Sequence, residues 1–402
     1  MLFQSEIEDY VDFDNSNHNN YTLPEQLASN DTMKCFAWSP KADTWWGKNP
    51  EWEVTIEQDE QFCFTPMKDG EKAKFFHDLH QIQYNTSHQH CSGATTFTKQ
   101  MFSSGWGADI SNVASGLIHG YTTKQPFQIK TIDYWHYAAK KKKYRTPNDK
   151  PVCKSGDMFC YFLPIGACPA VEKKSAIQNI RTARPQGQLA DWATEYATRQ
   201  QQWLRKEVYD YMKHHAPLVQ TPCAAMHVRR SDAVIPGSRG RSRKYFPISS
   251  YIDMLVKYEK KIKINSNSPR NTKNILLFTD DQNAIEEAHE FHPEYNWMYL
   301  NKTRHRGSSG GWENQIPSGS PKDEVVAILT IFKLARKCDV FVNSLSGFAD
   351  LIYSAMVETG GREVKRLEID DNTFKEKVNN HISENELQVR LESLRKNITS
   401  TI

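Results

Sequence analysis

The sequence predicts an α/β fold built on an open parallel sheet. Three short apolar segments, at 223–228, 274–281 and 338–347, each predict a buried strand, and helical patterns follow the last two. Each segment ends abruptly in polar residues, and open α/β sheets bind their ligands just beyond the carboxyl ends of the strands. The length of 402 residues suggests two domains, with three as the alternative.

The segment 223–228 is the expected central strand. Its residues are small and apolar, with no proline or glycine, and it is followed by Arg229, Arg230 and Asp232. Two adjacent guanidinium groups offer the paired donors that suit phosphate oxygens. A solvated strand end with surface arginines is the alternative when this motif is taken alone.

The other two strand ends carry groups that fit the same ligand. The second predicted strand ends in Asp280 and Asp281, and the third closes in a turn with Ser344 and Ser346, ahead of an expected helix at 348–357. Hydroxyl groups and free amides at the start of a helix form an anion site, although either serine alone could be only a helix N-cap. Together the three strand ends predict a pocket for a nucleotide diphosphate.

The N-terminal half is expected to form a first lobe that ends in a linker helix. A helical pattern covers 189–213, as one helix or as two joined by a kink, and Pro217 marks its end. Gly105 and Gly107 precede another helical pattern, where glycines let backbone amides approach a phosphate, although a plain tight turn fits them too. The expected divisions are a polar leader with a Trp-rich segment at 1–75, an α/β lobe with the linker helix at 76–216, a Rossmann-like lobe at 217–362 and a charged tail with a short helix at 363–402.

Composition limits the classes of partner. The net charge of +3 gives no general sign of nucleic-acid binding. No apolar run approaches the roughly 20 residues that a membrane span requires. Residues 1–21 are acidic and rich in asparagine, unlike a signal peptide. The chain is therefore either cytosolic or without its targeting segment in this sequence.

Glycosylation sequons and cysteines favour the second alternative, with an oxidising lumen as the compartment. Cys223 and Cys338 fall on predicted core strands, and we expect them to be buried thiols. The other six cysteines fall in irregular, aromatic-rich segments where disulfides would help, and their pairing stays open. The sequons begin at Asn20, Asn30, Asn85, Asn301 and Asn397, and the six cysteines are Cys35, Cys63, Cys91, Cys153, Cys160 and Cys168.

A metal site is not expected. His77 with His80, and further on His88 and His90 with Cys91, could supply ligands, but no second cluster at a suitable spacing completes a tetrahedral site. The sequence also lacks a Walker-type loop, a Gly-x-Ser-x-Gly elbow and a His-Glu-x-x-His motif.

The motifs together resemble those of the α1,6-fucosyltransferase family, which includes the animal enzyme that fucosylates the core of N-glycans and the rhizobial nodulation enzyme. The first family motif resembles 227–232 followed by 247–251. The second and third motifs resemble 278–281 and 339–346, and the likeness extends over about 75–360. Upstream features that match the family lie at 105–107, 135–138 and 202–208.

The resemblance implies a GT-B-like fold, in which two α/β lobes face each other, and transfer of fucose from GDP-fucose with inversion and without a divalent metal. Guanidinium groups would then stabilise the charge that develops on the leaving GDP. GDP-fucose is the donor substrate, and no cofactor is expected. The implied catalytic residues are Arg229, Arg230 and Asp232, and the implied donor-binding residues are His227, Arg229, Arg230, Tyr251, Asp280, Asp281, Ser344, Ser346 and Gly107 through its backbone amide.

The sequence departs from the family pattern where the general base is expected. Ala233 takes the position of a lysine, and residues 233–250 contain no carboxylate. Transfer to a sugar hydroxyl usually needs a base, and Asp323 and Glu324 are candidates by position only. A different acceptor or an inactive chain would also account for the departure.

The expected acceptor is the core GlcNAc of N-glycans, on a glycoprotein or an oligosaccharide, with an α1,6 linkage and in the Golgi lumen or elsewhere in the secretory pathway. Protein O-fucosylation or fucosylation of another glycan is the second hypothesis. A non-catalytic relative that binds a nucleotide or a glycan is the third. No nucleic-acid partner is expected, and the membrane anchor and targeting segment are expected to lie outside this sequence.

Overall fold

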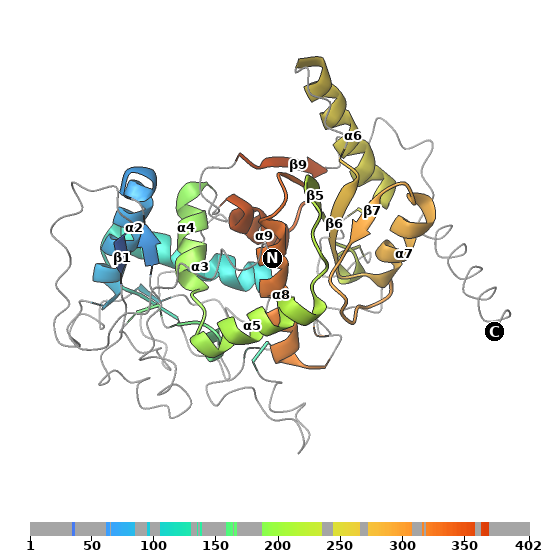
Figure 1. Cartoon of the computed structure of the whole chain (residues 1–402). Helices are drawn as coiled ribbons and strands as arrows, with labels where there is room; N and C mark the ends of the chain where they lie inside the picture. The colour runs from blue at the N-terminus through green and yellow to red at the C-terminus, as the bar shows by residue number, and fades with distance from the viewer. Residues whose placement is uncertain are drawn as a thin grey trace.

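A five-stranded parallel sheet forms the centre of the C-terminal half of the protein (Figure 1). Its strands are β5 (Cys223–Val228), β6 (Asn274–Thr279), β7 (Asn296–Met298), β8 (Val340–Ser344) and β9 (Lys365–Ile369), in the order β7-β6-β5-β8-β9. The computed structural model describes residues 34–36, 62–64, 66–84, 95–96, 105–129, 135, 137–138, 158–163, 165–166, 187–234, 244–265, 272–307, 316, 319–357 and 363–369.

The strand order places β5 where the chain changes direction across the sheet. From β5 the chain passes to β6 and β7 on one side, and it then returns to β8 and β9 on the other. Rossmann-like sheets have this order and bind ligands at this switch point, outside the carboxyl ends of the strands. The register sets Val228 beside Thr279 and His227 beside Asn343. The three predicted strands are therefore confirmed as neighbours whose carboxyl ends meet at one edge.

Helices cover both faces of the sheet, as strands that are apolar on both sides require. Side chains alternate along β5, so that Ala224 and Met226 pack towards α6 and α7 whereas Ala225 packs towards α8 and α9. The predicted α/β class is confirmed. These helices are α6 (Ile248–Asn265), α7 (Gln282–Phe291), α8 (Pro321–Ala335) and α9 (Gly347–Val357).

The helices of the N-terminal half pack on α8 and α9 and form a further layer (Figure 1). Val325 of α8 and Leu351 of α9 are buried in the same apolar cluster as Ile110 of α3. The linker pattern forms two helices with a break at 198–201. No described helix is long and apolar enough to span a bilayer. The elements are α2 (Pro66–Tyr84), α3 (Trp106–Thr123), α4 (Gln188–Ala197) and α5 (Gln202–His215), the antiparallel pair β1 (Lys34–Phe36) and β2 (Phe62–Phe64), and the parallel pair β3 (Thr95–Thr96) and β4 (Phe127–Gln128).

Two of the expected division points do not coincide with the ends of structural elements. α2 begins at Pro66, ahead of the boundary expected after residue 75, and β9 lies in the segment expected to be a charged tail. All five residues of β9 pair with β8, and as the edge strand β9 accommodates exposed polar side chains. The sheet therefore extends beyond residue 362. Residues 370–402, with the expected short helix, lie outside the described part of the chain.

The expectation that Cys223 and Cys338 are buried thiols is wrong, because these two residues form a disulfide bond. Both are buried, and their Cα atoms are 4.8 Å apart, where the neighbouring strands β5 and β8 begin. Cys160, one of the six cysteines expected to pair, is also disulfide-bonded. The Cys223–Cys338 bond joins positions 115 residues apart in the sequence, and only the strand order brings them together.

Candidate functional site

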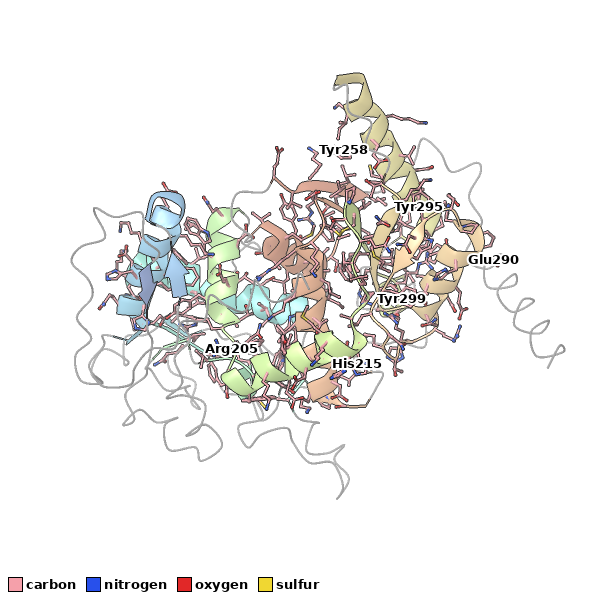
Figure 2. All side chains as sticks on the ribbon, viewed as in Figure 1. Arg205, His215, Tyr258, Glu290, Tyr295 and Tyr299 are labelled. Atoms are coloured by element: carbon pink, nitrogen blue, oxygen red, sulfur yellow. A yellow bond between two sulfur atoms is a disulfide. The ribbon has the colours of Figure 1, made fainter. Side chains whose placement is uncertain are left out.

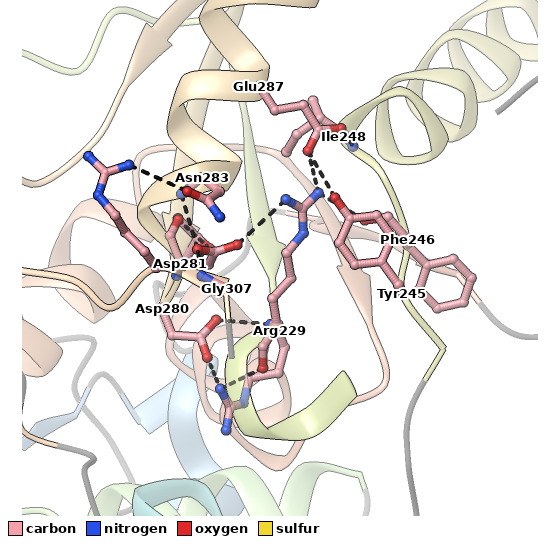
Figure 3. A network of polar contacts seen from close by, with 12 residues as sticks. Arg229, Tyr245, Phe246, Ile248, Asp280, Asp281, Asn283, Glu287 and Gly307 are labelled. Carbon is pink, nitrogen blue, oxygen red and sulfur yellow. Dashed lines mark hydrogen bonds and ion pairs between the residues drawn. The ribbon is translucent and has the colours of Figure 1, made fainter. Parts of the chain in front are cut away.

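Arg229 follows directly on the carboxyl end of β5, at the switch point of the sheet. Because β5 and β6 are parallel and in register, Asp280 takes the matching place beyond β6, and Arg229 Nη1 forms an ion pair with Asp280 Oδ2 (Figure 3). Asp280 Oδ1 also accepts the backbone N–H of Arg230 at 2.9 Å. The side chains of Arg229 and Asp280 are 24% and 28% exposed, so this pair is partly accessible to a ligand.

Arg230 has a different environment, although it is the next residue. Its guanidinium is buried, with Nη2 2.6 Å from Glu287 Oε2 and 3.1 Å from the carbonyl oxygen of Phe246. Its Nη1 lies 3.7 Å from Asp281 Oδ2. Glu287 Oε1 in turn accepts the backbone N–H of Ile248 at 2.7 Å, at the start of α6 (Figure 3). Arg230 therefore joins the tip of β5 to both helices of this face.

Protein groups stabilise the charge of Arg230. Burial by itself lowers the pKa of Arg230, but the charges of Glu287, Tyr245 and Asp281 outweigh it and raise this pKa above the usual value. The guanidinium carbon also lies 4.4 Å from the centroid of the Tyr245 ring, which favours the cation. A diphosphate contact from Arg230, as expected from the sequence, would have to displace these partners.

Asp281 belongs to the same buried framework. Its Oδ1 atom accepts the backbone N–H of Asn283 at 3.0 Å and thereby caps α7. The same oxygen accepts the N–H of Gly307 at 2.9 Å, which ties the loop after β7 to the start of α7 (Figure 3). Of the two adjacent aspartates, Asp280 thus faces the partly exposed arginine and Asp281 faces the buried one.

The serine turn after β8 combines structural and exposed positions. The Ser344 hydroxyl is hydrogen-bonded to Tyr251, and burial raises the pKa of Tyr251 to about 12. Ser346 Oγ accepts the backbone N–H of Phe348 at 3.3 Å, so the N-cap interpretation is confirmed for this serine. Both serines are buried, whereas Leu345 between them is exposed.

The first turns of α3 and α9 touch each other. A Cβ atom on Gly107 would lie 2.5 Å from the carbonyl carbon of Gly347 and from the nitrogen of Phe348, so this approach requires glycine. His227 of β5 packs on Phe348, with 5.6 Å between the ring centroids. Both helix N-termini carry partial positive charge, and they add to that of Arg229 around the strand tip. This arrangement favours an anionic ligand.

Buried groups of the N-terminal half complete the surroundings of Arg229. The Tyr137 hydroxyl accepts the backbone N–H of Trp106, in the first turn of α3, at 3.1 Å. Burial raises the pKa of Tyr137, while the nearby charge of Glu324 raises it further and that of Arg229 lowers it. The charges of both Arg229 and Glu324 therefore act on the Tyr137 hydroxyl.

The two candidates for the general base differ in their surroundings. Glu324, in the first turn of α8, is buried and forms an ion pair with Lys302. Asp323 is exposed, and its backbone N–H donates to Ser320 Oγ at 3.3 Å. Glu324 is thus the buried candidate, and its charge, like that of Arg229, acts on the pKa of Tyr137.

The structure divides the predicted site residues into two groups. His227 and Arg229 lie around the end of β5 together with Asp280, and the buried framework beside them holds Arg230, Asp281, Tyr251, Ser344, Ser346 and Gly107. Asp232 lies in the short 3-10 helix Ser231–Val234, and its side chain is outside the described part.

Glu287 was missed by the sequence analysis, although it is the centre of the buried network. It lies on the buried face of α7 beside Ala284 and Ala288. A carboxylate on an apolar helical face is the signal that could have found it, because a buried acid needs a cationic or hydrogen-bonding partner.

A group of three or more metal-binding side chains does not occur among the described residues. His77 Nδ1 is 3.4 Å from Asp78 Oδ1. Burial, together with the charges of Arg199 and His77, lowers the pKa of His80 to about 3. His88, His90 and Cys91 lie outside the described part of the chain.

Comparisons with known proteins find matches among solved structures. No protein-family model and no curated protein matches the sequence. NodZ α1,6-fucosyltransferase soaked with GDP-fucose is 11% identical over 69% of this chain and 93% of its own, with a TM-score of 0.36. The selenomethionine form of NodZ from Bradyrhizobium is 12% identical over the same shares, with a TM-score of 0.35. POFUT1 in complex with GDP-fucose is 12% identical over 44% of this chain, with a TM-score of 0.25, and the match spans 48% of POFUT1, about half of its length.

Proposed function

We propose that this chain is a glycosyltransferase that moves fucose from GDP-fucose to a hydroxyl group of a glycan acceptor, with inversion and without a divalent metal. The position of Arg229 carries the proposal. It places a partly exposed guanidinium at the carboxyl end of the central strand, at the switch point of a Rossmann-like sheet. The order of the sequence motifs, which resembles that of the α1,6-fucosyltransferases, supports GDP-fucose as the donor.

Arg229 binds the diphosphate of the donor in this proposal. A guanidinium can donate to two phosphate oxygens at once, and Asp280 holds it at the strand tip before the donor arrives. Negative charge develops on GDP as the bond to fucose breaks, and a positioned cation stabilises that charge. The first turns of α3 and α9 add partial positive charge from the other side.

Arg230 is a positioning residue in this proposal. Its guanidinium holds α6 and α7 to the end of β5 through Glu287 and the Phe246 carbonyl group, and its backbone N–H holds Asp280. His227 remains a proposed donor ligand, together with Ser344, Ser346, Tyr251, Asp281 and Gly107, and Asp232 is proposed to orient the donor.

The acceptor that we propose is the core GlcNAc of N-glycans, with an α1,6 linkage, in the lumen of the Golgi or another secretory compartment. The disulfide between Cys223 and Cys338 supports an oxidising compartment. The second candidate is a fucosyltransferase with another acceptor, either a protein hydroxyl or a different glycan. Ala233 and the absence of a carboxylate from 233–250 favour that candidate, because they remove the expected base.

Titration calorimetry of the purified full chain with GDP tests the proposal, in buffers with EDTA and with magnesium. Equal affinity in the two buffers is expected. Arg229→Ala should lower the affinity on the order of 10- to 100-fold, the equivalent of one charged hydrogen bond. Arg205→Ala, on α5 (Figure 2), is the matched control and should leave the affinity unchanged.

A transfer assay with labelled GDP-fucose then separates the candidates. N-glycan acceptors, other glycans and folded glycoprotein domains are presented side by side, and label on one class names the acceptor. Binding of GDP without transfer to any acceptor identifies a non-catalytic relative. A chain that binds neither GDP nor GDP-fucose removes the proposal altogether.

A further inference from the structure

The segment after β7 alternates between anchored and exposed side chains. Leu300 is 1% exposed, and Lys302 and Arg304 are turned towards the protein, whereas Asn301 and Thr303 are exposed. The segment follows Tyr299, which is labelled in Figure 2, and it has no helix or strand of its own. Asn301 and Thr303 are the first and third residues of an Asn-x-Thr sequon, the acceptor pattern for N-linked glycans.

Two basic residues fix the segment from the inside. Arg304 donates through Nη2 to the carbonyl oxygen of Leu300 at 2.5 Å and through Nη1 to that of Lys302 at 2.9 Å. Its Nε donates to the carbonyl oxygen of Thr279, at the end of β6, at 3.2 Å. Lys302 forms an ion pair with Glu324 of α8. The even-numbered residues therefore hold the loop to the core, and the sequon side chains point away from it.

An independent observation favours a compartment in which such a sequon is modified. Cys223 and Cys338 are joined in a disulfide buried at the base of the sheet. Disulfides of this kind form in the endoplasmic reticulum and other oxidising compartments and are rare in the cytosol. N-linked glycans are attached in that same lumen.

We propose that Asn301 is a glycosylation site that carries an N-linked oligosaccharide. The side-chain amide nitrogen of Asn301 forms a bond to the anomeric carbon of the first sugar of an oligosaccharide carried on a lipid diphosphate. The bond from that carbon to the phosphate oxygen breaks, the lipid diphosphate leaves, and the amide loses one proton. The glycan projects into solvent, because its attachment point is exposed between two anchored residues.

The proposal is tested on the full chain expressed through the secretory pathway of a eukaryotic cell. The purified protein is digested with trypsin after treatment with peptide N-glycosidase in ¹⁸O water, which converts a glycosylated asparagine into labelled aspartate. The expected result is labelled aspartate at residue 301 in wild-type protein and in Thr303→Ser, which keeps the sequon. Thr303→Ala and Asn301→Gln should lose the glycan from this site alone.

GDP affinity is measured in parallel, and all four proteins should bind GDP equally, so failure of the site and failure of the proposed enzymatic activity give different results. Unlabelled Asn301 in a protein whose other sequons are occupied overturns the proposal. A second result would overturn both the site and the oxidising compartment. In that result no sequon is labelled, and Cys223 and Cys338 react with a thiol reagent in denaturant without reductant.

Discussion

The guanidinium of Arg230 and the carboxylate of Glu287 form an ion pair, 2.6 Å from Nη2 to Oε2, in which neither side chain is more than 5% exposed. The pair lies beneath the strand tip where Arg229 is accessible. Its two members come from the end of β5 and from the middle of α7, and Glu287 also accepts the first amide of α6. The place of the accessible arginine thus depends on the buried one.

Glu287→Gln should lower the free energy of unfolding by about 3 kcal/mol or more, because it leaves the buried charge of Arg230 without its main partner. Urea denaturation measures the change. Glu286→Gln is the matched control, since its ion pair with Arg306 is at the surface and its loss should cost about 1 kcal/mol or less. Similar losses in both variants would contradict the role given to Glu287.

His80 should make the protein less stable in weak acid. The pKa of His80 in the folded protein, about 3, lies below the ordinary value of 6.5. Between these two pH values, His80 is protonated in the unfolded chain and neutral in the folded one. The stability contributed by neutral His80 is therefore complete above about pH 6.5 and falls as the pH drops towards 3, by up to roughly 1.4 kcal/mol per pH unit.

Denaturation curves between about pH 6 and pH 4 measure this slope. His80→Gln should reduce it by the equivalent of nearly one proton. His214→Gln, at an exposed position of α5, should leave it unchanged. A slope that His80→Gln does not alter would mean that the imidazole is protonated in the folded protein.

Replacing both Cys223 and Cys338 by alanine should lower the free energy of unfolding by about 5 kcal/mol, because the bond closes a loop of 115 residues in the unfolded chain. The burial of both sulfur atoms further predicts that a mild reductant leaves the bond intact until denaturant is added. Full reduction of the native protein, with no loss of stability, would refute this prediction.

Glu324→Gln should lower fucose transfer by on the order of 10²- to 10⁴-fold with little change in GDP affinity, if Glu324 is the general base. Asp323→Asn, the adjacent exposed carboxylate, is the control and should transfer normally. Transfer assays at saturating donor compare the two. Loss of transfer in Asp323→Asn alone would reverse the assignment, and normal transfer in both would place the base elsewhere.

Local patterns in the sequence are enough to find the three central strands of the sheet. The segments that form β5, β6 and β8 are short, apolar and followed by polar residues, and these properties are local. The N-cap role of Ser346 is also within reach of the sequence, since a serine at the start of a helical pattern is a local signal. β9 was missed because an edge strand with charged residues resembles a solvated tail.

Partners distant in the sequence cannot be found in this way. Arg229 and Arg230 are adjacent and identical in type, but one faces Asp280 and the other faces Glu287, 57 residues away. The same limit applies to Cys223, whose partner depends on which strand lies next to β5. Only the three-dimensional arrangement distinguishes the accessible arginine from the buried one.

The Cys223–Cys338 disulfide and the proposed donor site lie at opposite ends of β5 and β8. The disulfide joins β5 and β8 where they begin, whereas their carboxyl ends carry Arg229 and the turn with Ser344. Separation of the two strands is therefore opposed by a covalent bond at one end and by hydrogen bonds alone at the other. We therefore expect any separation of these two strands to occur at the end that carries Arg229, and not at the end that the disulfide closes.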